Sequence, residues 1–177
     1  MKLSKHKLPH YFATFYVNFI RGTPLLVQIY LIYFGLASLI NLPDMVAAVV
    51  SLSMNSGAYV AEIVRAGIQA VDKGQTEAAR SLGLTRFQTM RFIVLPQAIK
   101  NILPALGNEF ITLLKDTSLI TVIGGKEMLY AAQAIYAKTY APMMPLVGTA
   151  ILYLIVVVLF TWLLGILERR LRQSDRR

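Results

Sequence analysis

The feature that most constrains the fold is a run of apolar residues near the C-terminus, 151–160, inside a longer apolar segment at 142–167. About 20 mostly apolar residues are enough for a helix to cross the hydrocarbon of a bilayer. Hydrophobic residues make up 56 % of the 177-residue chain and charged residues only 15 %. Because helices satisfy their own backbone hydrogen bonds in lipid, these values predict an all-α, polytopic integral membrane protein.

Three further segments are apolar enough to be spans, and residues that break helices separate them. The four expected spans are 22–40, 44–71, 96–124 and 142–167. The breaks are Asn41-Leu42-Pro43, Asp72-Lys73-Gly74, Gly124-Gly125 and Ala141-Pro142. Such clusters interrupt helices because Gly and Pro favour turns. The sequence therefore predicts about four transmembrane helices, preceded by a segment 1–21 in the cytoplasm or at the membrane interface.

The basic residues lie mainly on one side of this arrangement. Of the 18 Lys and Arg residues, most precede the first span, surround the loop 72–95 or follow the fourth span; they include Lys2, Lys5, Lys7, Arg65, Lys73, Arg80, Arg86, Arg91, Lys100, Arg169, Arg170, Arg172, Arg176 and Arg177. The opposite loops hold only Lys126 and Lys138. By the positive-inside rule, both termini, the loop 72–95 and the tail 168–177 are expected in the cytoplasm.

The same composition excludes several classes of protein. A nucleic-acid-binding protein could share the net charge of +9, but it would not carry the apolar runs, so no nucleic-acid partner is expected. The chain has no cysteine, which excludes a disulfide framework and a thiol nucleophile. A metal role is not expected of the two histidines, His6 and His10, because no acidic cluster lies near them.

The loop 72–95 has a regular local pattern. The pattern begins with Glu77-Ala78-Ala79, has Gly83 four residues after Ala79, and ends with Ile93-Val94-Leu95-Pro96, at the start of the next span. Good helix formers at 75–82 predict a helix that ends at Gly83, where a left-handed backbone satisfies the last carbonyls. Thr85 and Gln88 match a capping box that starts a second helix. That helix is expected to stop near Leu95, because a proline disfavours helix in the residue before it.

This spacing resembles the EAA signature, E-A-A-x3-G-x9-I-x-L-P, of the membrane-spanning subunits of bacterial ABC importers. The resemblance implies a type I ABC-importer-like fold, in which the loop docks on a separate ATP-hydrolysing subunit. It assigns ATPase coupling to Glu77, Ala78, Ala79, Gly83, Leu95 and Pro96. ATP and Mg²⁺ are then expected in the partner ATPase, so this chain is expected to be neither an enzyme nor the holder of a cofactor.

Four further blocks are similar to the permeases for polar amino acids, at 19–28, 55–65, 105–111 and 114–119. This resemblance implies import of a polar amino acid across the bacterial inner membrane. The expected partners are two ATP-binding subunits, a second permease copy or a homologous permease, and an extracytoplasmic substrate-binding protein. Members of this group usually have five core spans, whereas this chain starts within what resembles the first cytoplasmic loop, so the first span is expected to be missing.

Polar residues inside the spans are candidates for the substrate pathway, since ionisable groups at membrane depth are rare. Ser51, Asn55, Tyr59 and Glu62 share one helical face, and Asn108, Thr112 and Lys115 share another. We assign the pathway to Gln28, Asn55, Glu62, Asn108, Glu109 and Thr112. The alternative is structural, because polar side chains commonly bond between membrane helices, at about 0.6 kcal/mol each. Arg65 could neutralise Glu62 in the same way.

Other functions remain open at this point. The same architecture serves importers of other small solutes, such as an opine, a methionine-like compound or a metal chelate. A self-contained secondary transporter or channel would show an inverted repeat or more spans, and neither is visible in the sequence. A membrane enzyme would need a catalytic constellation, yet the chain has no H-E-x-x-H motif and no Ser/His/Asp set.

Overall fold

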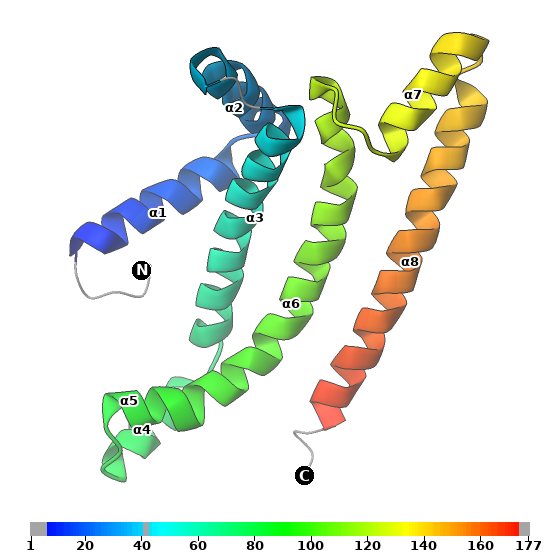
Figure 1. Ribbon diagram of the computed structural model, residues 1–177. Helices are drawn as coiled ribbons and strands as arrows, with labels where there is room; N and C mark the ends of the chain where they lie inside the picture. The colour runs from blue at the N-terminus through cyan, green and yellow to red at the C-terminus, as the bar shows by residue number, and fades with distance from the viewer. Residues whose placement is uncertain (1–6, 41–42, 174–177) are drawn as a thin grey trace.

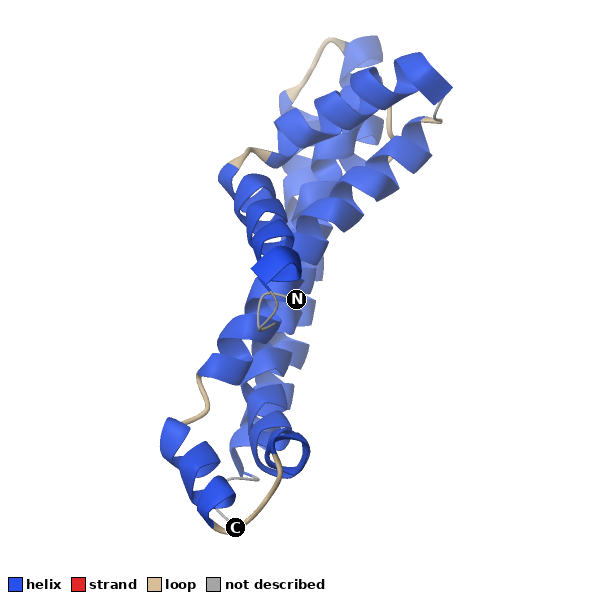
Figure 2. Cartoon of the chain, turned by 90° about the vertical axis from the view of Figure 1, so that its left-hand side faces the viewer, coloured by secondary structure: helices blue, strands red, loops and turns tan. Residues whose placement is uncertain are grey.

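The computed structural model describes residues 7–40 and 43–173, and within them the chain is helical with no strand. The helices are α1 Lys7–Gly22, α2 Leu25–Ile40, α3 Asp44–Gln69, α4 Lys73–Ser81, α5 Arg86–Thr89, α6 Leu95–Asp116, α7 Met128–Thr139 and α8 Met143–Gln173. Helices α3, α6 and α8 run along the length of the molecule, with α6 between the other two (Figure 1). The view from the side is long and narrow (Figure 2). The all-α prediction is confirmed.

The predicted spans correspond to α2, α3, α6 and α8, but they differ in length and polarity. Helices α3 and α8 are long and apolar enough to cross a membrane, and the pair α1–α2 is a third candidate if it is taken as one broken span. Helix α6 has 22 residues, but its polar side chains keep it out of the group of helices apolar enough to cross a membrane. The corresponding sequence segment, 96–124, is also the least hydrophobic of the four predicted spans.

The first predicted span, 22–40, joins the preceding helix α1 at a sharp bend. The chain bends by 107° between α1 and α2, at Thr23 and Pro24. Pro24 has no N–H to donate and disfavours helix at Thr23, so α1 ends before it and α2 starts after it. Helix α2 has 16 residues, which reach about 24 Å at 1.5 Å each, less than the roughly 30 Å of hydrocarbon.

Parts of the expected charge pattern, one of the two histidines and part of one expected break lie outside the described residues. These are Lys2, Lys5, His6, Asn41, Leu42, Arg176 and Arg177.

Small residues bring α6 close to both of its neighbours. A Cβ atom added to Gly67 on α3 would lie 2.3 Å from Ile102 Cγ1, and one added to Gly107 on α6 would lie 2.3 Å from Leu164 Cδ1 on α8. Ala98, on the face of α6 toward α3, is fully buried. Glycine and alanine let membrane helices approach closely and gain dispersion contacts. Helix α6 is therefore held firmly between α3 and α8.

Helix α7 is absent from the sequence prediction, which placed a loop there. Its first turn is capped by Glu127, whose carboxylate accepts hydrogen bonds from the backbone N–H groups of Leu129 (2.7 Å) and Tyr130 (2.6 Å). The Tyr153 hydroxyl on α8 donates to the same carboxylate at 3.0 Å. These bonds satisfy donors that a helix start leaves unpaired and fix α7 against α8.

Candidate coupling loop and polar pathway

Helix α4 is defined at both ends by local hydrogen bonds. Asp72 caps its start, with Oδ1 accepting from the Gly74 N–H at 2.7 Å. At its end, Gly83 has φ +85°, its N–H donates to the Arg80 carbonyl (3.1 Å), and the Leu84 N–H donates to the Ala79 carbonyl (3.2 Å). This is a Schellman motif. The prediction that Gly83 ends the helix is confirmed, while the helix starts at Lys73, two residues before the predicted 75.

The capping box at the start of α5 is also confirmed. The Gln88 N–H donates to Thr85 Oγ1 at 3.2 Å, and the Thr85 N–H donates to Gln88 Oε1 at 2.8 Å. The two bonds satisfy donors at both positions and set the direction in which α5 leaves the turn. Helices α4 and α5 thus form a compact projection, the coupling loop (residues 72–95), at one end of the molecule (Figure 1).

The prediction that the second helix stops near Leu95 is wrong. The chain continues through one wide π-helical stretch, Met90–Val94, directly into α6, and the Leu95 N–H donates to the Met90 carbonyl five residues back. A π stretch widens the helix, and a proline is tolerated in the first turn of a helix. Pro96 therefore does not interrupt the helix here. As a result, the coupling loop is joined to α6 by continuous helix.

Most of the residues assigned to ATPase coupling lie at the surface. Glu77, Ala78, Gly83, Leu95 and Pro96 are exposed, whereas Ala79 is buried. Two apolar side chains outside that assignment stand out on the loop, Leu82 (83 % exposed) and Phe87 (71 % exposed). Large apolar side chains on an otherwise polar projection make this surface a candidate for docking on a partner. The signal was available in the sequence as apolar residues within a charged loop.

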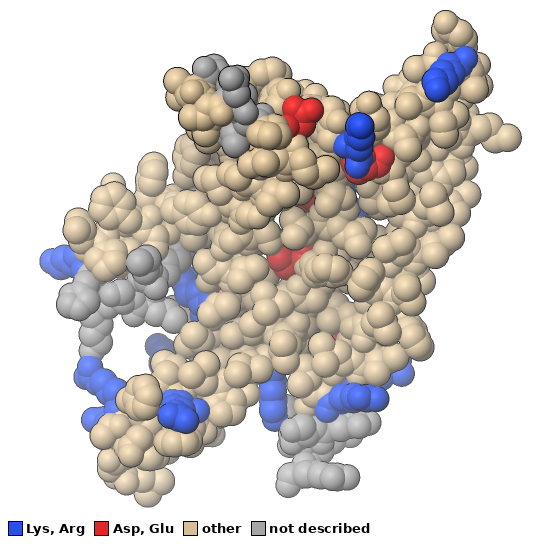
Figure 3. Space-filling model, in the orientation of Figure 1, with Lys and Arg blue, Asp and Glu red and all other residues tan. Residues whose placement is uncertain are grey.

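Charge is distributed unevenly along the molecule. Figure 3 shows basic side chains gathered toward the lower end, around α4, α5 and the end of α8, while acidic side chains lie in the middle and upper parts of this face. Helix α7 lies at the upper end (Figure 1), with Lys126 and Glu127 just before it in the chain and Lys138 within it.

The structure brings two of the six predicted pathway residues, Gln28 and Asn55, into direct contact. Both are buried, and Asn55 Nδ2 donates to Gln28 Oε1 at 2.9 Å. Gln28 Nε2 donates to the carbonyls of Ile20 (2.7 Å) and Thr23 (3.0 Å). These carbonyls lie at the α1–α2 bend, so the Gln28 amide supplies the donors that the interrupted helix lacks.

Glu62 lies in an ion cluster that joins α1 to α3. Arg65 Nε lies 3.0 Å from its carboxylate, and Arg21 NH1 lies 3.6 Å from it. The Arg21 guanidinium also lies over the Tyr59 ring, 5.2 Å from the centroid. The pairing of Glu62 with Arg65 agrees with the structural alternative in the sequence analysis, in which Arg65 neutralises Glu62. Arg21 was not assigned as a partner of Glu62, because α1 and α3 meet only in the folded chain.

The polar residues of α6 are arranged differently. Asn108, Thr112 and Lys115 are exposed along one face, as the spacing predicted, and the Thr112 hydroxyl donates to the Asn108 carbonyl at 3.1 Å. Glu109 is half-buried on the adjacent face. In the described part of the chain, no group of three or more acidic or histidine side chains could hold a metal ion.

Together, the membrane-length helices, the projecting coupling loop and the polar face of α6 define a multi-pass permease subunit. The chain belongs to the family described as binding-protein-dependent transport system inner membrane component, which matches residues 1–173. The family places it in the inner membrane and implies separate ATP-binding subunits and a substrate-binding protein.

Relatives from several bacteria are similar over nearly the whole chain. A putative glutamine transport system permease of Rickettsia bellii is 44 % identical over 172 residues, which is 96 % of this chain and 79 % of the relative. The arginine transport system permease ArtQ of Bacillus subtilis is 43 % identical over 176 residues, 98 % of this chain and 80 % of the relative.

Solved structures show the same fold. The crystal structure of an amino acid ABC transporter with histidines superposes with a TM-score of 0.93 at 51 % identity, covering 96 % of this chain and 80 % of that one. The inward-facing methionine transporter MetNI superposes with a TM-score of 0.75 at 22 % identity, covering 93 % of this chain and 76 % of that one. The expected ABC-importer fold is therefore confirmed.

Proposed function

We propose that this chain forms the translocation pathway of an ATP-driven importer of polar amino acids and couples to its ATPase through α4–α5. The observation that carries the proposal is the coupling loop, a rigid projection that continues into α6. The glutamine and arginine permeases among the relatives, and the amino acid transporter at 51 % identity, support the substrate class.

The coupling mechanism follows from the continuity of the helix. Glu77 and Ala78 present the exposed surface of α4 to the ATPase, and Gly83 sets the turn to α5. Leu95 and Pro96 sit where the π stretch meets α6. When ATP binding brings two ATPase subunits together, the displaced coupling loop pulls on α6. The close packing at Gly67 and Gly107 passes this movement from α6 to α3 and α8. ATP and Mg²⁺ bind in those subunits, and this chain holds no cofactor.

The topology follows the charge distribution. In this topology the chain has the parts that the sequence predicts: the N-terminal segment 1–21, spans within 22–71, the coupling loop 72–95, spans within 96–167 and the basic tail 168–177. Both termini and the coupling loop face the cytoplasm, where basic loop residues are retained. Helix α7 then lies at the extracytoplasmic surface, where the substrate-binding protein delivers its cargo.

A second permease subunit is needed to cover the polar face of α6. Exposed Asn108, Thr112 and Lys115 cannot face hydrocarbon without a large cost, so they line a wet pathway shared with a second copy or a homologous permease. In this pathway Glu109 and Glu62 meet the cationic groups of an amino acid, and Asn108 meets its carboxylate. Gln28 and Asn55 hold the α1–α2 bend beside it.

The test is co-purification of the ATPase with this chain, together with ATP-dependent uptake of radiolabelled glutamine, arginine and histidine. Gly83→Pro cannot adopt φ +85° and loses the N–H that donates to Arg80, so it should lose both the ATPase and uptake. Gly148→Ala in α8 is the matched control, since a Cβ there meets nothing within 4 Å. A wild-type chain that folds but brings down no ATPase refutes the proposal, and uptake of none of these amino acids refutes the substrate class.

A further inference from the structure

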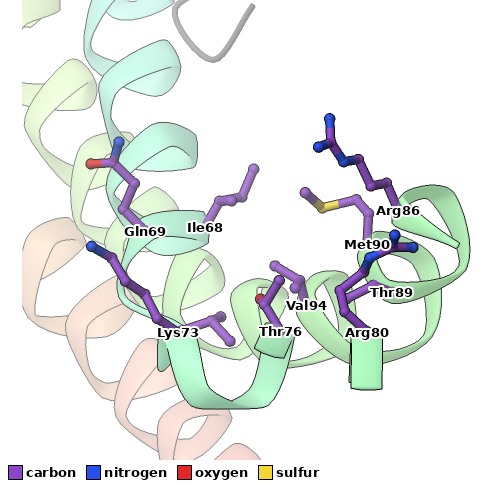
Figure 4. A pocket seen from close by; sticks show the side chains of 10 residues that line it. Ile68, Gln69, Lys73, Thr76, Arg80, Arg86, Thr89, Met90 and Val94 are labelled. Atoms are coloured by element: carbon purple, nitrogen blue, oxygen red, sulfur yellow. The ribbon is translucent and has the colours of Figure 1, made fainter. Parts of the chain in front are cut away.

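A pocket of about 790 Å³ lies between the end of α3 and the coupling loop. Figure 4 shows the side chains from α3, α4, α5 and the π stretch that line it. The volume is within the range of about 300–1,000 Å³ typical of small-molecule sites. The pocket is separate from the polar face of α6 and from the exposed tip of the loop.

The charged side chains of the pocket are all basic. Lys73, Arg80 and Arg86 line it, and no carboxylate does. Within the described residues, none of the three is in an ion pair, and the Arg80 guanidinium donates to the Leu84 carbonyl. Arginine and lysine without a carboxylate partner are suited to a phosphoryl group, whose oxygens accept several hydrogen bonds.

The remaining lining is largely apolar. Among the lining residues, Val71 and Val94 are buried, and Ile68 and Met90 add further apolar surface. In Figure 4, Lys73 and Arg86 lie on opposite sides of Ile68. A free phosphate would leave this apolar surface in water, whereas an amphipathic anion would cover it and meet the cations at the same time.

The position of the pocket favours one amphipathic anion. It lies where α3 ends and α6 begins, which is the level of the lipid headgroups if the coupling loop is cytoplasmic. Basic clusters next to a transmembrane helix on that side attract anionic lipids. The tip of the loop, with Leu82 and Phe87, stays free for the ATPase subunit.

We propose that this pocket binds an anionic phospholipid of the cytoplasmic leaflet. Lys73 and Arg86 attract the anionic headgroup from the two sides of the pocket, and acyl-chain carbons lie along Ile68, Met90 and Val94. The bound lipid connects the end of α3 to the coupling loop, so the lipid composition of the membrane sets how firmly ATPase movement is passed to α6. This inference rests on the topology of the proposed function.

The experiment is native mass spectrometry of the intact transporter complex, purified in detergent and titrated with phosphatidylglycerol or phosphatidylcholine. The double variant Lys73→Gln/Arg86→Gln should bind phosphatidylglycerol about 30-fold more weakly, at roughly 1 kcal/mol for each basic residue. Arg80 is left in place because it supports the Gly83 turn. Lys126→Gln/Lys138→Gln, at the α7 end, loses the same charge and should bind as the wild type does.

Each outcome decides the proposal. Equal phosphatidylglycerol binding by both double variants refutes it, as does equal retention of the two lipids by the wild type. Displacement of the lipid by inorganic phosphate at matched concentration shows a simple anion site and also refutes it. Loss of the ATPase from Lys73→Gln/Arg86→Gln shows that the cations belong to the docking surface instead. A wild-type chain without ATPase refutes the proposed function, while lipid binding to that chain is still measured.

Discussion

Gln28→Met tests whether the buried amide network holds the α1–α2 bend. Methionine keeps the length of the side chain but cannot donate to the Ile20 and Thr23 carbonyls or accept from Asn55. Three bonds at about 0.6 kcal/mol each give about 2 kcal/mol. If the buried Asn55 amide finds no other hydrogen-bond partner, its lost hydration adds about 2 kcal/mol to this destabilisation. We therefore expect the free energy of unfolding to fall by about 2–4 kcal/mol.

The assay is unfolding of the purified chain in mixed micelles, followed by circular dichroism. The matched control is Gln97→Met, which removes one local bond from an exposed glutamine to the Ile93 carbonyl and should change the free energy by less than about 0.5 kcal/mol. In a double-mutant cycle, Gln28→Met and Asn55→Leu should be non-additive by about 0.6–1.7 kcal/mol.

Unchanged stability of Gln28→Met would distinguish a role in transport from a role in the fold. If Gln28→Met unfolds as the wild type does and the cycle is additive, the network does not hold the bend. If the same variant then has an altered Km for amino-acid uptake, the sequence assignment of Gln28 and Asn55 to the substrate pathway is the better one.

Three further changes test other parts of the fold. Gly67→Val pushes against Ile102 and should lower the free energy of unfolding by about 1–3 kcal/mol, whereas Gly148→Val, in open space, should not; equal stability of the two would contradict close α3–α6 packing. Glu127→Gln should weaken the cap of α7 by about 1 kcal/mol and speed hydrogen exchange in its first turn; unchanged exchange would count against the cap. Glu77→Ala should keep the melting temperature of the isolated chain but reduce co-purified ATPase, and undiminished ATPase would remove Glu77 from the docking surface.

Much of the coupling loop could be predicted from the sequence, because its turns depend on contacts within a few residues. Gly83 ends α4, and the Thr85–Gln88 box starts α5, as expected. The π stretch could not be predicted in this way. Pro96 favours a break by its local chemistry, and only the packing of Val94 and Ala98 against α3 shows that the helix continues.

The sequence by itself determined the class of protein, the long apolar helices α3 and α8 and the turns of the coupling loop. Apolar length and local capping are properties of neighbouring residues. Only the tertiary structure decided which polar residues meet one another. Gln28 and Asn55 are 27 positions apart, and Arg21 and Glu62 belong to different helices. Whether such side chains are satisfied by each other or left for a substrate depends on how helices pack, and that packing is set by non-local contacts such as those at Gly67 and Gly107.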